Sequence, residues 1–162
     1  MAYKNKVYVA FDGDNDMSYY NLLKAWHANE NIDFTFYNAH AINTARDSSQ
    51  EASIKSQLRI RLNNTKVLIL LVGEHTRYLY KFVRWELETA LRMDIPIIAV
   101  NLNGLRYMDE NRCPPIIQDK FVVHIAFNRK ALKYAIENWP QYYQSHKNSQ
   151  NGAMYYKDGI YD

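Results

Sequence analysis

A run of six apolar residues, Val67-Leu68-Ile69-Leu70-Leu71-Val72, limits what this chain can fold into more than any other stretch. The run is much shorter than the roughly 18 apolar residues of a membrane-spanning helix. It also lacks the alternation of polar and apolar residues that marks a strand with one face in water. The run therefore predicts a central strand that is buried on both faces, in a sheet with helices on both sides.

Strand and helix patterns alternate along the rest of the chain. Further strands are predicted at residues 6–11, 32–37, 95–100 and 121–125. Helices are predicted at residues 17–28, 48–62, 81–91 and from 128 to Pro140 or, with a kink, to residue 145. This alternation predicts an α/β fold with a parallel sheet. We expect a flavodoxin-like three-layer sandwich with strand order 2-1-3-4-5, in which the ends of strands 1 and 3 lie side by side where such sheets bind ligands.

Length and composition fit one globular domain followed by a short tail. The 162 residues are 48% hydrophobic and 23% charged, which suffices for one ordinary core. We expect that domain at residues 1–145 and a tyrosine-rich tail at residues 146–162. In the tail, Asp158-Gly159 between aromatic residues indicates a hairpin. Whether the tail docks on the domain, forms an interface or is disordered stays open at this point.

Charge, cysteine and histidine content argue against several classes of function. The net charge of +3 is small and the basic residues are scattered, so neither nucleic acid nor a membrane is an expected partner. The chain starts without an apolar signal segment, and we expect a cytoplasmic protein. Cys113, the only cysteine, is expected in a loop without nucleophilic activation. The five histidines show no ligand spacing, so no metal site is expected.

Two phosphate-binding classes also fit the sequence poorly. The first strand ends in Asp12-Gly13-Asp14 instead of a glycine-rich loop, and this negative charge would repel a phosphate without a metal. A phosphoacceptor receiver domain of the same topology needs an Asp after strand 3 and a Lys after strand 5. Those positions hold Gly73-Glu74 and Ala126-Phe127, which argues against a receiver.

Glu86 is the residue that fits its helix pattern least. One face of the predicted helix carries an apolar stripe of Val83, Leu87, Ala90 and Leu91. Another face carries a charged i,i+4 ladder of Arg84, Glu88 and Arg92. Glu86 is expected at the edge of the packed face, beside the cleft. A carboxylate there is costly unless it is used, although a first-turn Glu is also favoured by the helix dipole or by a nearby cation.

Several stretches of the chain together resemble a known family. They are Leu62-Asn63-Asn64-Thr65-Lys66-Val67, Leu71-Val72-Gly73-Glu74-His75-Thr76, and Phe82-Val83-Arg84-Trp85-Glu86-Leu87 followed by Ile97-Ile98-Ala99-Val100. In this order and spacing they resemble the TIR-like (Toll/interleukin-1 receptor-like) domain of the Thoeris anti-phage defence family, over roughly residues 5–104. The resemblance implies an enzyme that cleaves the nicotinamide–ribose bond of NAD. It implies a cyclic or otherwise modified ADP-ribose product that activates a separate effector.

The resemblance also implies roles for individual residues. It places the catalytic glutamate at Glu86, with NAD as a substrate and no further cofactor. Together with the expected strand order, it implies substrate-binding residues at Phe11, Asp12, Gly13, Asn38, His40, Tyr78 and Trp85. It further implies self-association on activation and a phage-derived trigger. Two alternatives stay open: a TIR-like module that binds partners without catalysis, and a flavodoxin-like protein that binds flavin or another nucleotide.

The chemistry of the implied reaction agrees with a carboxylate at position 86. Breaking the nicotinamide–ribose bond builds positive charge on the sugar in an oxocarbenium-like transition state. A fixed carboxylate beside the ribose stabilises that charge, and nicotinamide leaves as a neutral base without a general acid. A synthase must bring a nucleophile to the ribosyl cation before water arrives. The long loops at residues 38–47 and 101–120 are the expected walls of such a crevice, and we expect a cyclised or conjugated product.

Overall fold

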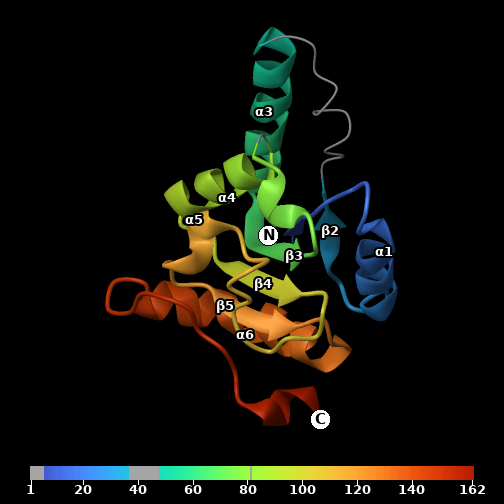
Figure 1. The fold of residues 1–162 in the computed structure, drawn as a ribbon, viewed down its shortest axis with the longest axis vertical. Coiled ribbons are helices and arrows are strands. Elements are labelled where there is room, and N and C mark those ends of the chain that lie inside the picture. Colours follow the sequence, from blue (N-terminus) through green and yellow to red (C-terminus); the bar gives the residue numbers. More distant parts are fainter. Residues whose placement is uncertain (1–5, 37–47, 81) are drawn as a thin grey trace.

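The computed structural model describes residues 6–36, 48–80 and 82–162, which form an α/β fold around one parallel sheet. The strands are β1 (Lys6–Ala10), β2 (Asp33–Thr35), β3 (Thr65–Val72), β4 (Ile97–Asn101) and β5 (Val123–Ala126). They pair in the order β2-β1-β3-β4-β5, and every pair is parallel (Figure 1). This confirms the predicted fold class and strand order. The carboxyl ends of β1 and β3 are neighbours at the point where the order reverses.

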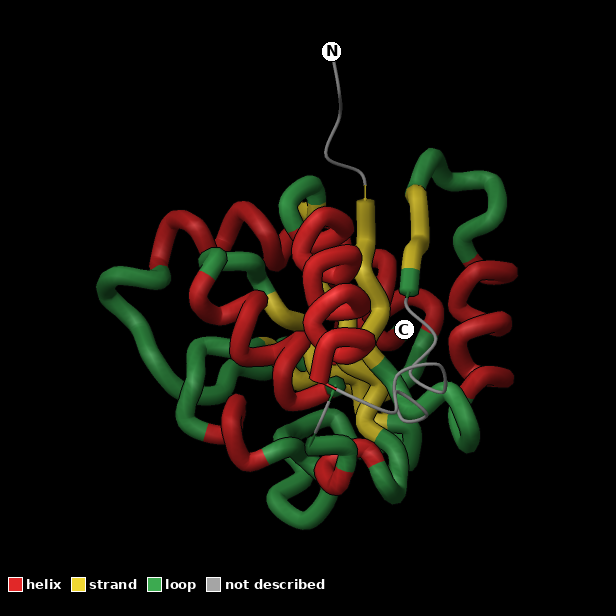
Figure 2. Tube along the Cα trace, turned by 90° about the horizontal axis from the view of Figure 1, so that it is seen from above, coloured by secondary structure: helices red, strands yellow, loops and turns green. Residues whose placement is uncertain are grey.

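Helices cover both faces of the sheet, which makes three layers (Figure 2). α1 (Met17–Trp26) and α6 (Arg129–His146) contribute to the core on one face. α3 (Ser48–Leu62), α4 (Val83–Arg92) and the short α5 (Pro115–Gln118) contribute to the core on the other. A short 3-10 helix, η1 (Thr76–Tyr78), follows β3.

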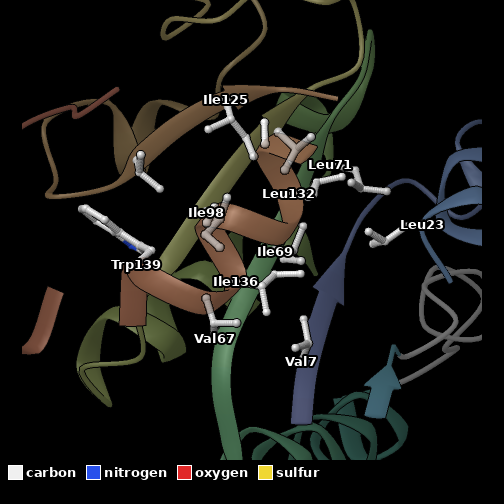
Figure 3. Packing of buried hydrophobic residues seen from close by; sticks show 14 of the residues in the cluster. Val7, Leu23, Val67, Ile69, Leu71, Ile98, Ile125, Leu132, Ile136 and Trp139 are labelled. Atoms are coloured by element: carbon white, nitrogen blue, oxygen red, sulfur yellow. The ribbon is translucent and has the colours of Figure 1, made fainter. Parts of the chain in front are cut away.

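β3 supplies side chains to both cores, as its uninterrupted apolar sequence predicts. Val67, Ile69 and Leu71 face α1 and α6. Leu68, Leu70 and Val72 face α3 and α4. All six are at most 1% exposed, so nearly all of their apolar surface is removed from water, which stabilises the fold. Figure 3 shows the first of these cores, where Leu132, Ile136 and Trp139 of α6 lie over the strands.

The segment at residues 101–120, expected to be a long loop, is folded onto the body of the protein. It contains α5, and the side chains of Cys113 and Ile117 are fully buried. The Asp109 carboxylate orders the turn before α5 because it accepts the backbone N–H groups of Asn111 and Arg112 and the Asn103 side-chain amide. Burial raises the pKa of the Cys113 thiol to about 12, which agrees with the expectation of an unactivated cysteine.

The tail docks on the outer edge of the sheet. Met154 pairs with β5, since its N–H donates to the Val122 carbonyl and its carbonyl accepts the His124 N–H, both at 2.8 Å. The predicted hairpin at Asp158-Gly159 is wrong: a 3-10 turn, η2 (Asp158–Tyr161), occupies that position. Too few residues follow Gly159 to form a second strand, and the last turn instead places the Tyr161 hydroxyl as acceptor of the Ala126 N–H at 2.9 Å.

Two further findings concern helix ends. α6 continues through Pro140 to His146, close to the longer of the two predicted ends. Asp16 holds the N-cap position of α1, but its side chain makes no capping hydrogen bond. Within the described ranges, none of the helices combines the length and the apolar character that crossing a bilayer requires.

Candidate active site

The carboxyl end of β1 leads into a tight polar turn that Asp12 holds in place. The Asp12 carboxylate accepts the Asp14 N–H at 3.1 Å and the Asn15 side-chain amide at 2.6 Å. Its carbonyl accepts the Asp16 N–H at 2.8 Å. Asp12 is consequently only 4% exposed. Its carboxylate is already engaged in ordering the turn, and the adjoining Gly13 is half-buried.

Phe11 and Trp85, both predicted to bind the substrate, lie on opposite faces of the sheet. Phe11 stacks on Tyr20 with ring centroids 5.1 Å apart and belongs to the core beneath α1. Trp85 belongs to the core beneath α3, with Lys55 and Arg59 at 5.6 and 5.5 Å from its ring. The two rings therefore do not meet around one ligand.

Tyr78, Asn38 and His40 complete the predicted set of binding residues. Tyr78 lies in η1 after β3 and is 60% exposed, with the Arg77 guanidinium 5.8 Å from its ring. Asn38 and His40 lie outside the described residues, as does the whole of the predicted wall at residues 38–47. Among the predicted binding residues that the structure describes, Tyr78 has the most accessible ring.

Glu86 lies in the first turn of α4 and points into the protein. Its N–H donates to the Phe82 carbonyl at 2.7 Å, which starts the helix, and the residue is only 5% exposed. The buried face of α4 is wider than the predicted stripe because it also includes Trp85, Glu86 and Thr89. Glu86 is therefore more deeply buried than the expected edge position. The outer ladder is present in part, with an Arg84–Glu88 ion pair at 3.0 Å.

Burial dominates the electrostatics of Glu86. It raises the pKa of the Glu86 carboxyl from 4.5 to about 8, and a side-chain hydrogen bond with Tyr8 lowers this value in part. Tyr8 comes from β1 and is itself fully buried. A carboxyl group with such a pKa is mostly protonated at neutral pH and becomes a carboxylate when a positive charge approaches it.

Tyr8 is a site residue that sequence reasoning missed. Its side chain faces the same core as Leu58 and Leu62 of α3, although its hydroxyl is polar. The signal in the sequence was the Tyr8 hydroxyl, which is the only side-chain polar group between Val7 and Ala10 of β1. A buried tyrosine usually has a hydrogen-bond partner for its hydroxyl, but the sequence did not indicate that the partner is Glu86.

A pocket of about 380 Å³ is formed by residues of α3, α4 and the segment before α4, and Glu86 is not among the residues that line it. Lys55, Tyr80, Trp85 and Glu88 contribute to its walls. Tyr80 is 64% exposed, so this surface offers an aromatic ring flanked by charges of both signs. Among the residues that the structure describes, no group of three or more His, Cys, Asp or Glu side chains could hold a metal ion.

Comparison with known families gives a match that spans β1 to β4 and includes the candidate site. A family model described as Thoeris protein ThsB, TIR-like domain, matches residues 8–107. The match covers more than half of the 162 residues and runs from Tyr8 in β1 to the segment after β4. It includes Glu86 and all the residues predicted to bind substrate.

Proposed function

The chain belongs to the TIR-like domain family of Thoeris protein ThsB, a family of anti-phage defence, and from this we propose that it cleaves the nicotinamide–ribose bond of NAD. Glu86 acts as the catalytic carboxylate. The product is a cyclic or otherwise modified ADP-ribose that activates a separate effector. NAD is a substrate here, and the reaction uses no further cofactor.

The observation that carries this proposal is the buried Glu86 itself. It is 5% exposed, and burial raises its pKa to about 8. Removing a carboxylate from water without a cationic partner is unfavourable for folding. Such a cost is typical of groups that act on a substrate, because perturbed pKa values cluster at functional sites.

The proposed chemistry uses the charge of Glu86 in the transition state. The bond between the ribose C1′ and the nicotinamide nitrogen breaks, its electron pair leaves with nicotinamide, and positive charge develops on the sugar. The Glu86 carboxylate stabilises that charge and accepts hydrogen bonds from the ribose hydroxyls. The ribosyl cation then bonds to a nucleophile, either water or a nitrogen or hydroxyl of the same nucleotide.

Binding of NAD itself ionises Glu86 in this proposal. The oxidised nicotinamide ring is cationic, and a cation close to a carboxyl group lowers its pKa. The neutral form of Glu86 keeps the empty site stable, and the charged form appears when there is a cation to stabilise. Tyr8 donates its hydrogen bond to the ionised carboxylate and holds it in position.

The direct test is release of nicotinamide from NAD by purified protein, followed by chromatography and mass spectrometry. Wild type is compared with Glu86→Gln, which keeps the shape but removes the charge, and with Glu137→Gln as a matched control at an exposed position of α6. We expect release by wild type and Glu137→Gln and none by Glu86→Gln. Since self-association and a phage-derived trigger are proposed for activation, the assay is repeated with lysate from infected cells.

A second candidate function, a module that binds partners without catalysis, is favoured by one observation. At 5% exposure, Glu86 offers a substrate little access, whereas Tyr78 and Tyr80, which precede α4 in the chain, are exposed by 60% and 64%. This alternative predicts that cells carrying Glu86→Gln stay protected against phage. It also predicts that Tyr80→Ala loses protection while the purified protein releases no nicotinamide under any condition.

A further inference from the structure

A second pocket, which the proposed reaction does not use, opens at the carboxyl ends of the central strands. Its volume is about 310 Å³. We call it the switch-point pocket, and its walls include Asn15, Asp16, Tyr19, Gly73, His75 and Arg112. Tyr19 packs against the core beneath α1 and α6, on the face of the sheet opposite Trp85.

Asp16 lines this pocket and does not cap α1 with its side chain. It holds the N-cap position of α1, where an aspartate normally accepts a backbone N–H of the first turn, yet its side chain makes no such bond. Asp16 is 8% exposed, and its Oδ2 atom is buried without a hydrogen-bond partner among the described residues. A buried carboxylate oxygen normally accepts a hydrogen bond, and the described residues supply no donor to this one.

Gly73 makes room for the Asp16 carboxylate. A Cβ added at Gly73 would collide with Asp16 Oδ2 and would lie 2.9 Å from Asp16 Cγ. The Gly73 N–H does not satisfy the carboxylate because it donates to Thr76 Oγ1 at 2.9 Å. The first residue after β3 thus supplies space to Asp16 and no hydrogen bond.

The charges around Asp16 restrict the ligand. Asp12 and Glu74 raise the pKa of Asp16, and His75 and Arg112 lower it, with burial as the largest cause of a rise to about 6. Arg112 is itself paired with Glu74 at 3.6 Å. This acidic surrounding disfavours a phosphate group. A metal ion is also disfavoured, because the described residues offer no set of three suitable ligands.

We propose that the switch-point pocket binds one ribonucleoside, whose 2′- and 3′-hydroxyls donate hydrogen bonds to the Asp16 carboxylate. The volume is near the lower end for small-molecule sites, which suits a nucleoside better than a dinucleotide. The Tyr19 ring and Leu102 provide apolar wall for the base. This site is separate from NAD cleavage and does not depend on it.

The test is binding of adenosine, compared with 2′-deoxyadenosine, by isothermal titration calorimetry and protein NMR at pH 7.5. Adenosine has no phosphate and no nicotinamide bond, so the proposed reaction does not consume it. A hydrogen bond to a charged group is worth about ten-fold or more in affinity. We expect adenosine to bind wild type at least ~10-fold more tightly than 2′-deoxyadenosine. Equal affinity for both nucleosides overturns the proposal.

Variants locate the site. Asp16→Asn and Gly73→Ala should each weaken adenosine binding at least ~10-fold, the first by removing the charged acceptor and the second by displacing it. Asp14→Asn is the matched control because it removes one charge from the same turn at an exposed position, and it should bind as wild type does. Wild-type affinity in Asp16→Asn contradicts the proposal. So does binding of Mg²⁺, but not adenosine, that depends on Asp16.

Discussion

Burial shifts the pKa values of Glu86, Asp16 and His124, and the direction of each shift sets how that residue responds to pH. It raises the pKa of Glu86 to about 8 and that of Asp16 to about 6, and it lowers the pKa of His124 to about 4. His124 is fully buried on β5, and neither ring nitrogen has a hydrogen-bond partner in the described part of the chain. Each of these groups is held toward its neutral form because burial penalises charge.

Replacing Glu86 by Gln should stabilise the protein at alkaline pH. The folded-state pKa of about 8 lies above the unfolded value of 4.5. The stability associated with the protonated group is therefore fully present below pH 4.5 and is lost as pH rises through 8. We expect the free energy of unfolding of Glu86→Gln to exceed that of wild type by about 2–4 kcal/mol at pH 8.5.

Urea unfolding at pH 4.5 and pH 8.5 measures this difference, and the advantage of the variant should shrink toward the lower pH. Glu88→Gln, on the outer face of α4, is the control for loss of a charge from the same helix. A variant less stable than wild type at pH 8.5 would contradict the burial of an ionisable Glu86.

Tyr8→Phe tests whether the hydroxyl on β1 positions the Glu86 carboxylate, the proposed catalytic group. Loss of the hydrogen bond removes the contact that lowers the pKa of Glu86. The acid limb of kcat/KM for nicotinamide release should then move to higher pH, with partial activity retained on the alkaline side. An unchanged pH profile together with normal activity would show that Tyr8 serves packing alone.

At the scale of elements, the tail and β5 stabilise one another through backbone groups. Met154 satisfies the N–H of His124 and the carbonyl of Val122, and Tyr161 satisfies the N–H of Ala126. Arg106, from the segment after β4, pairs with Asp158 at 3.0 Å and lies 4.0 Å from the Tyr161 ring. The tail therefore joins β5 to the loop that follows β4.

Tyr161→Phe should weaken this docking by a measurable amount. The Ala126 N–H loses its acceptor in a buried place, which costs about 1–2 kcal/mol in the free energy of unfolding. Hydrogen exchange at the Ala126 amide should accelerate. Tyr155→Phe is the control, since Tyr155 is 55% exposed and touches Tyr107 by its ring. Unchanged exchange in Tyr161→Phe would mean that the tail does not protect β5.

Elements with strong local patterns were predictable from the sequence, and those built by distant contacts were not. The apolar run of β3 and the stripe of α4 depend on burial alone, which sequence periodicity reports. α5 was missed because a four-residue helix held by Cys113, Ile117 and the Asp109 turn has no periodicity of its own. Within the candidate site, the position of Glu86 on α4 was predictable, but its contact with Tyr8 joins residues 78 positions apart.

At the scale of the whole molecule, Glu86 and His124 oppose each other in their effect on stability. The folded pKa of His124, about 4, lies below the usual 6.5. The unfolded chain therefore binds more protons at that residue between pH 6.5 and 4, and stability falls as pH decreases through this range. Glu86 changes stability in the reverse sense over pH 4.5–8. Where the ranges overlap, the two effects largely cancel.

Single variants should separate these effects. We expect His124→Leu, which removes the acid-labile group, to lose stability steadily from pH 4.5 to pH 8. Glu86→Gln should gain stability mainly between pH 6 and 6.5, because Asp16, with its pKa raised to about 6, opposes the effect of His124 at lower pH. The double variant should change little above pH 6. Urea titrations at intervals of half a pH unit measure the free energy of unfolding of wild type, the two single variants and the double variant. A wild-type profile that follows His124→Leu throughout would exclude a role for His124.

The bridge between Met154 and β5 also bears on how the protein behaves when it is concentrated. A strand at the edge of a sheet offers unpaired N–H and carbonyl groups to any other chain that passes. β2, the strand at one edge of the sheet, is only three residues long. At the other edge, the Met154 segment forms hydrogen bonds with backbone groups at β5. A chain cut after Gln150 would expose that second edge, and its copies should join there and precipitate at concentrations where the intact chain stays dispersed.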